Sequence, residues 1–141
     1  LIFKSIKIML IGLIPNLFVA SSVIGLLGLL SLPLDIMTIT VAAISVGMAV
    51  DNSIHYMYRY KKEMKLNNKN ILESLKNAHL TSGRAIFYTA ATIATGFSIL
   101  VISNFFPTRL FGVFTAIAMV LAFLSSLTIL PTMLYRMRVF K

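Results

Sequence analysis

The chain has 141 residues, of which 58% are hydrophobic and 12% charged, and its formal net charge is +9. This length allows one domain, and the apolar fraction is far above that of an ordinary soluble domain. The chain contains no Cys, which excludes disulfides. It does not begin with Met and opens in an apolar run, so we expect an excerpt or truncation of a longer protein.

Four long apolar stretches predict an all-α fold, a polytopic membrane helix bundle. Residues 8–30 carry no charge and would form a helix of about 34 Å, which is long enough to cross a bilayer. Three further transmembrane helices are predicted at 36–58, 85–106 and 110–135. Residues 1–141 are therefore interpreted as a partial transmembrane domain.

The predicted connections differ in length. Residues 31–35 form a short turn, in which Asp35 is expected to cap the second span, and residues 107–109 form another. Residues 59–84 form a long polar loop, interpreted as cytoplasmic. Within it an apolar stripe with helical spacing predicts a short interfacial helix lying along the membrane surface. The stripe consists of Ile71, Leu72, Leu75 and Ala78.

The basic residues predict the orientation of the spans. Of the 13 Lys and Arg residues, all but Arg109 lie at the two ends of the chain or in the long loop. The positive-inside rule places these parts in the cytoplasm. This distribution explains the net charge without nucleic acid, and no basic–aromatic RNP motif or Cys/His finger is present.

Asp51 is the only acid within a predicted span. It shares one helical face with Gly47, His55 and Tyr58, because these residues are spaced four, four and three apart. An ionisable group at membrane depth is costly and is by default a functional-site hypothesis. Low dielectric favours the neutral carboxyl, so Asp51 can load and release a proton near neutral pH. The alternative is a structural acid paired with another helix.

Two neighbours of Asp51 are candidates for the same proton relay. Asn52 lies about 100° around the helix and could instead hydrogen-bond to a neighbouring span. His55 lies one turn nearer the cytoplasm and could relay protons or be an interfacial His wetted by water. For both residues the structural and functional interpretations stay open.

Two hydroxyl residues complete the predicted relay. Tyr56 belongs to a group of tyrosines placed where an aromatic belt is expected, and a role in the relay is the second interpretation. Thr89 begins a threonine stripe with Thr92 and Thr95. Helix packing is the simpler interpretation of this stripe, and Thr89 is its best functional candidate.

The residues predict neither an enzyme nor a metal site. Cys is absent and the two His residues, His55 and His79, are far apart in sequence. An intramembrane aspartyl protease would need two membrane-embedded acids, and no nucleophile–base pair stands out. We expect no cofactor, with protons as the coupling ion.

The ordered motifs of the chain resemble the RND superfamily, and within it the MMPL-like branch of exporters of hydrophobic and lipid-like molecules. The resemblance covers essentially the whole chain. The motifs that carry it are GLIPNLF at 12–18, LPLD at 32–35, GMAVDNSIHY at 47–56, GRAIFYT at 83–89 and FGVF at 111–114.

The resemblance implies a bacterial inner-membrane protein of two six-span halves with periplasmic domains, of which this chain is the last four spans of one half. It implies that Asp51 takes part in the proton translocation that drives export, with Thr89 linked to the same relay. Many members have a second acid or a Tyr where this chain has Asn52. The relay is therefore expected to need partners from the other half.

The expected partners are membrane lipids, the missing half and periplasmic domains of the same protein, and a homo-oligomer or periplasmic partner, without nucleic acid. Both ends of the chain are expected in the cytoplasm. The alternatives are a regulatory sterol-sensing-type module, a SecD/SecF-like protein-translocation accessory, or a fragment that is inactive alone. Titration of Asp51 in a functional cycle would discriminate the exporter from the regulatory module.

Overall fold

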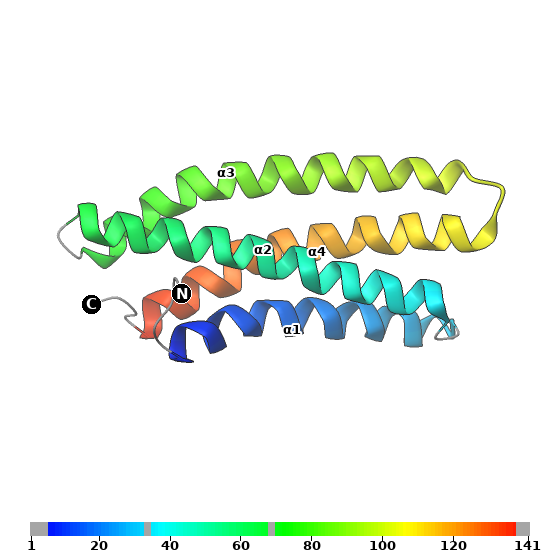
Figure 1. Ribbon diagram of the computed structural model, residues 1–141, viewed down its shortest axis with the longest axis horizontal. Helices are drawn as coiled ribbons and strands as arrows, with labels where there is room; N and C mark the ends of the chain where they lie inside the picture. Colours follow the sequence, from blue (N-terminus) through cyan, green and yellow to red (C-terminus); the bar gives the residue numbers. More distant parts are fainter. Residues whose placement is uncertain (1–5, 33–34, 68–69, 138–141) are drawn as a thin grey trace.

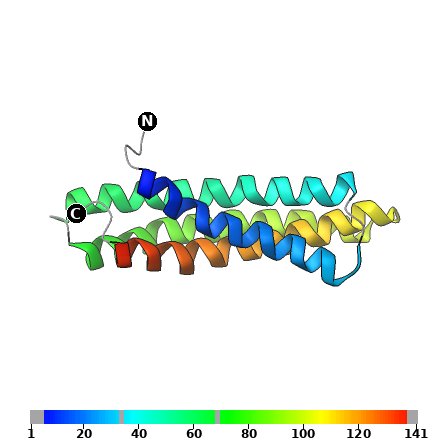
Figure 2. The same cartoon turned by 90° about the horizontal axis from the view of Figure 1, so that it is seen from below.

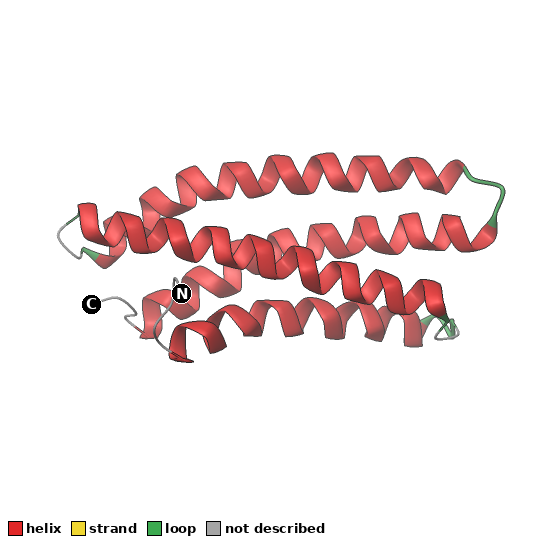
Figure 3. Ribbon diagram, in the orientation of Figure 1, coloured by secondary structure: helices red, strands yellow, loops and turns green. Residues whose placement is uncertain are grey.

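The computed structural model describes residues 6–32, 35–67 and 70–137, with side chains from Leu10 onward. Within these residues the chain is helical and contains no strand (Figure 3). The predicted all-α class is therefore confirmed. The elements are α1 (Ile6–Leu29), α2 (Ile36–Leu66), α3 (Ile71–Ser98), the short 3₁₀ helix η1 (Ile99–Ile102) and α4 (Phe106–Met137).

The four α-helices run alternately up and down along a common direction (Figures 1 and 2). Each is long and apolar enough to cross a membrane, which confirms the four predicted membrane helices. The start of α1, the end of α4 and the α2–α3 connection lie at one end, called here the α2–α3 end (Figure 1). Part of the predicted basic side, namely Lys4, Lys69 and residues 138–141, lies outside the described residues.

The predicted loop at residues 59–84 is almost entirely helical. The helix α2 continues to Leu66, and α3 begins at Ile71. With 31 residues, α2 measures about 46 Å, whereas the hydrocarbon core of a bilayer is about 30 Å thick. A separate surface helix is not confirmed, because the residues assigned to it form the first turns of α3.

Three of the four residues of the apolar stripe at the start of α3 pack on the bundle, whereas Leu72 is exposed. Ala78 is fully buried, and Ile71 and Leu75 pack against the same cluster as Tyr60 and Met64 of α2. A stripe with helical spacing shows that one face is apolar, but a membrane surface and a second helix satisfy that face equally well. The stripe therefore packs on the helix bundle rather than on a membrane surface, a choice that periodicity alone cannot predict.

The connection between α1 and α2 lies at residues 30–35, close to its predicted place. Ser31 has a φ of +51°, and the N–H of Leu32 donates to the carbonyl of Leu27 at 3.1 Å. This six-residue closure with a left-handed residue is a Schellman-type helix end. Pro33 and Leu34, which belong to the predicted turn, lie outside the described residues.

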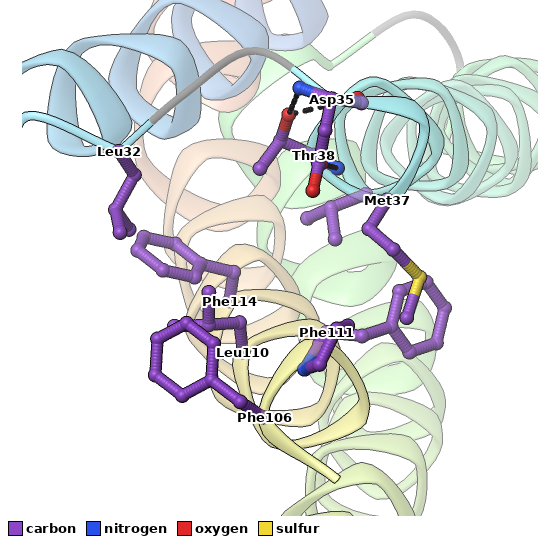
Figure 4. A pocket seen from close by; sticks show the side chains of 10 residues that line it. Leu32, Asp35, Met37, Thr38, Phe106, Leu110, Phe111 and Phe114 are labelled. Atoms are coloured by element: carbon purple, nitrogen blue, oxygen red, sulfur yellow. Dashed lines mark hydrogen bonds between the residues drawn. The ribbon is translucent and has the colours of Figure 1, made fainter.

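Asp35 caps α2, as predicted. The N–H of Thr38 donates to the Asp35 carboxylate at 2.8 Å, and the N–H of Asp35 donates to the Thr38 hydroxyl at 2.9 Å (Figure 4). This reciprocal capping box satisfies two backbone donors that the helix leaves free. The hydrogen bond from the Thr38 N–H is the main cause that lowers the pKa of Asp35 from its ordinary value.

The predicted turn at residues 107–109 is wrong by a few residues. The connection from η1 to α4 lies at 103–105, and Pro107 and Arg109 belong to α4. Pro is favoured in the first turn of a helix, where its missing N–H would have no intrahelical partner. Arg109 Nη2 reaches back to donate to the carbonyl of Ser103 at 3.2 Å.

The core consists of two clusters, and α3 contributes buried residues to only one of them. The cluster nearer the α2–α3 end contains residues of all four α-helices, with Ala78 and Ile86 from α3. The buried residues of the other cluster come from α1, α2 and α4 alone. The helix α3 is therefore an edge helix, which shares a core with α2 mainly near their connection (Figure 1).

Candidate functional site

A cleft between α2 and α3 brings together most of the predicted site residues. Its volume is about 380 Å³, which leaves room for roughly a dozen water molecules at about 30 Å³ each. The cleft is lined by Asp51, Asn52, His55, Tyr58 and Arg59 of α2 and by Ser82, Ala85, Ile86 and Thr89 of α3.

Asp51 and His55 form a pair on the open face of α2. Nε2 of His55 lies 3.4 Å from Oδ1 of Asp51, and the two side chains are 71% and 67% exposed, respectively. Gly47 and Tyr58 are also exposed, so the structure confirms the face that the spacing predicts. This face points away from the core of the bundle.

Asn52 lies at the inner edge of the same cleft. It is 6% exposed, and within the described part of the chain its Nδ2 is buried without a hydrogen-bond partner. A buried donor left unpaired costs about 1–3 kcal/mol. The position of Asn52 therefore favours a polar partner, such as water in the cleft or a group outside this chain.

Thr89 lies on the opposite wall of the cleft. Its hydroxyl donates to the carbonyl of Ala85 at 3.0 Å, which leaves the lone pairs of the oxygen free to accept a hydrogen bond. Thr92 and Thr95 are exposed as well. The threonine stripe of α3 therefore does not pack against the other helices of this chain.

Tyr56 is placed apart from the cleft. It is fully buried, and its ring meets that of His79 on α3 edge-on with 6.2 Å between centroids. Its hydroxyl has no hydrogen-bond partner among the residues that the structure describes. Tyr56 is therefore a core residue at the α2–α3 interface, and the structure does not bring it to Asp51.

Glu63 is a buried acid that the sequence analysis missed. It is 5% exposed, and its Oε1 lies 2.8 Å from Nη2 of Arg59. Its Oε2 accepts hydrogen bonds at 3.5 Å from the side-chain amides of Asn67 and, across the helix pair, Asn77. The available signal was the spacing of four between Asp51, His55, Arg59 and Glu63, which the assignment of residues 59–84 to a loop concealed.

A second polar group, around Asn16 of α1, was also missed. The side-chain amide of Asn16 donates to the carbonyl of Gly12 at 2.8 Å, and its Oδ1 accepts from Ser53 of α2 at 3.4 Å. The hydroxyl of Ser125 of α4 donates to the carbonyl of Pro15 at 3.1 Å. These bonds join three helices beside Pro15, which lies within α1. They give the buried polar groups the partners that such groups need in a membrane.

The described residues form no metal centre, but they line a second cleft of about 340 Å³ between α3 and α4, which includes His79, Arg84 and Tyr88. No group of three or more His, Cys, Asp or Glu residues in the part of the chain described could hold a metal ion. A smaller pocket of about 70 Å³ lies at the end opposite the α2–α3 end (Figure 4). Phe106, Phe111 and Phe114 line it, and its one acid, Asp35, is engaged in the helix cap.

The fold and the cleft define a multi-pass membrane protein with an acid–histidine pair on an open face of its helix bundle. The chain belongs to the MMPL family, whose family model matches residues 1–137. It is therefore related to RND-type transporters, and members of this family are transporters rather than enzymes.

One relative is a protein of Methanocaldococcus jannaschii whose name describes it as a membrane protein. It is 30% identical to this chain over 110 residues, which are 78% of this chain and 28% of the relative. The chain thus spans little more than a quarter of the length of that relative. No solved structure matches the chain.

Proposed function

We propose that this chain is part of an exporter of hydrophobic or lipid-like molecules in the bacterial inner membrane, and that Asp51 carries the proton that drives export. The observation that supports the proposal most is the position of the Asp51 carboxylate, which is exposed halfway along a helix of membrane-spanning length. A carboxylate facing lipid at this depth would be costly. The face is therefore expected to meet water or other protein.

The proton path follows from the order of the groups along α2. Asp51 takes up a proton that arrives through water and becomes neutral, a form that costs far less at membrane depth. His55, 3.4 Å away, accepts the proton and releases it toward the α2–α3 end, which is the predicted cytoplasmic side. Asn52 and Thr89 hold water between the walls of the cleft, and Tyr56 takes no part because it lies in the core.

The open face also supports the proposal that another part of the protein covers it. Asp51, Thr89 and Thr92 are all exposed in this chain. Polar groups of this kind associate with other helices in a bilayer, where the alternative is an unsatisfied group in hydrocarbon. We expect the other half of the protein to cover the face, with periplasmic domains, lipids and a homo-oligomer or periplasmic partner completing the exporter. Four helices alone should not transport.

The proposal is tested on the full-length protein reconstituted in vesicles with an imposed pH gradient, with a pH-sensitive dye inside. The variant Asp51→Asn keeps the size of the side chain and removes its titratable proton, so proton flux should fall to that of empty vesicles. The matched control is Asp35→Asn, which makes the same change in an acid outside the cleft. Its flux should equal that of the wild type, because Asn is also a good helix cap.

Unchanged flux in a correctly inserted Asp51→Asn variant would overturn Asp51 as the proton carrier. That result would favour the regulatory sterol-sensing-type module, which shares the pattern of spans without moving protons. Insertion is checked by flotation of the reconstituted vesicles, and folding is checked by gel filtration in detergent, where both variants should elute with the wild type.

A further inference from the structure

Four charged or titratable residues form a row along α2. Asp51, His55, Arg59 and Glu63 are each four residues apart, so successive members are neighbours on the helix surface. A step of four residues advances about 40° around a helix of 3.6 residues per turn. The row therefore winds from the open face into the bundle, and side-chain exposure falls from 67% at Asp51 to 7% at Glu63.

Glu63 holds Arg59 in place at the inner end of this row. The 2.8 Å ion pair joins the two side chains, and Asn77 joins Glu63 to α3. A carboxylate as buried as this one needs both a cation and further hydrogen bonds. Arg59 lines the cleft, and its buried Nε has no hydrogen-bond partner among the described residues. The guanidinium is thus fixed at one edge of the cleft.

The charges around His55 come from its own helix. Asp51 lies one turn before it and Arg59 one turn after it, and Tyr58 is the other titratable group of α2 in the cleft. The wall that α3 contributes consists of Ser82, Ala85, Ile86 and Thr89, none of which is charged. No described residue of α1 or α4 lines the cleft. Asp51 and Arg59 are therefore the charged side chains that share the cleft with His55.

We propose that Arg59 is a positioning residue that drives the proton off His55 toward the predicted cytoplasmic side, and that Glu63 limits how much of its charge reaches His55. This inference rests on the proposed proton transfer at Asp51. While Asp51 is ionised, its negative charge favours protonated His55. When Asp51 takes up the next proton this attraction ends and the repulsion from Arg59 remains, so the proton on His55 passes to water at the end of the cleft.

The experiment measures proton flux against pH for the full-length protein in vesicles. The transition that disappears in His55→Gln identifies the titration of His55. Arg59→Gln removes a positive charge, so the midpoint should move to higher pH. Glu63→Gln leaves the charge of Arg59 uncompensated, so the midpoint should move to lower pH. The interaction of unit charges about one helical turn apart beside water predicts a shift of roughly half to one and a half pH units.

Three further variants make the test decisive. The double variant Arg59→Gln with Glu63→Gln should have a midpoint between those of the wild type and Arg59→Gln, because Glu63 offsets only part of the charge of Arg59. Lys62→Gln removes a positive charge from an exposed neighbour outside the cleft and should leave the midpoint unchanged. Should Glu63→Gln fail to fold, the exchange Arg59→Glu with Glu63→Arg keeps the ion pair but brings a negative charge beside His55, and should move the midpoint to higher pH.

The inference would be overturned if Arg59→Gln and Glu63→Gln moved the midpoint in the same direction, or if they lowered the flux at every pH without moving the midpoint. The ion pair of Arg59 and Glu63 would then have a structural role alone. That failure is distinct from failure of the proposed function. If Asp51→Asn abolishes flux while the opposite shifts are missing, Asp51 still carries the proton. If Asp51→Asn leaves flux unchanged, both proposals fall.

Discussion

Gly112 of α4 lies where a side chain would collide with the end of α3 and with η1. A Cβ atom added at this position would lie 2.6 Å from the carbonyl oxygen of Phe97 and 2.7 Å from Cβ of Leu100. Carbon atoms in favourable contact are about 3.5–4.0 Å apart. With a side chain at Gly112, α4 must therefore move about 1 Å away from the end of α3 and η1. Overpacking of this kind costs about 1–3 kcal/mol.

Helix propensity acts in the opposite direction and must be removed from the comparison. Ala is favoured over Gly within a helix by about 1 kcal/mol, so Gly112→Ala alone would report a mixture of two effects. Gly96 of α3 is the matched control, because a Cβ there meets no atom within 4 Å. Gly96→Ala gains the propensity alone, and the difference between the variants isolates the collision.

The two variants are compared by unfolding the purified chain in detergent micelles. Gly112→Ala should be less stable than Gly96→Ala by about 1–3 kcal/mol, with Gly96→Ala at or above the stability of the wild type. Equal stability of the two variants would refute the close approach of α4 to the end of α3. Greater stability of Gly112→Ala would refute it more strongly.

Three further predictions concern the cap, the core and the proposed relay. Because its pKa is lowered, ionised Asp35 stabilises the fold above its ordinary pKa, and this contribution is lost as pH falls through the lowered value. The stability advantage of the wild type over Asp35→Ala in detergent should therefore shrink with acidification. A difference that does not depend on pH would contradict this prediction. Leu134→Ala, at a fully buried position, should cost about 2–5 kcal/mol, whereas Leu124→Ala, at a half-exposed one, should cost far less; equal costs would contradict the packing. Tyr56→Phe should keep the proton flux of the full-length protein, since its hydroxyl lies in the core; loss of flux would place that hydroxyl in the relay.

Local features of the fold were within reach of the sequence. The four membrane-length helices follow from the length of the apolar runs, and the cap at Asp35 follows from an acid placed directly before such a run. The pairing of Asp51 with His55 follows from a spacing of four on a helix. In each case the interacting groups lie within about one helical turn or one continuous segment, so the geometry of the helix alone decides them.

Features that depend on two distant segments required the tertiary structure. Tyr56 and Asp51 are both on α2, yet only the packing of α3 shows that Tyr56 lies in the core and that Asp51 lies in the cleft. Glu63 was assigned to a loop, and its hydrogen bond with Asn77 of α3 is a feature of the tertiary structure alone.

The division between the two kinds of feature has a single physical reason. Helical periodicity determines which residues share a face, because the backbone geometry is the same in every α-helix. Which face is covered, and whether by another helix, by lipid or by the rest of the protein, depends on contacts between segments far apart in sequence. The sequence by itself therefore determined the four membrane helices and the pairing of Asp51 with His55, and the tertiary structure decided which residues of α2 are open and which are buried.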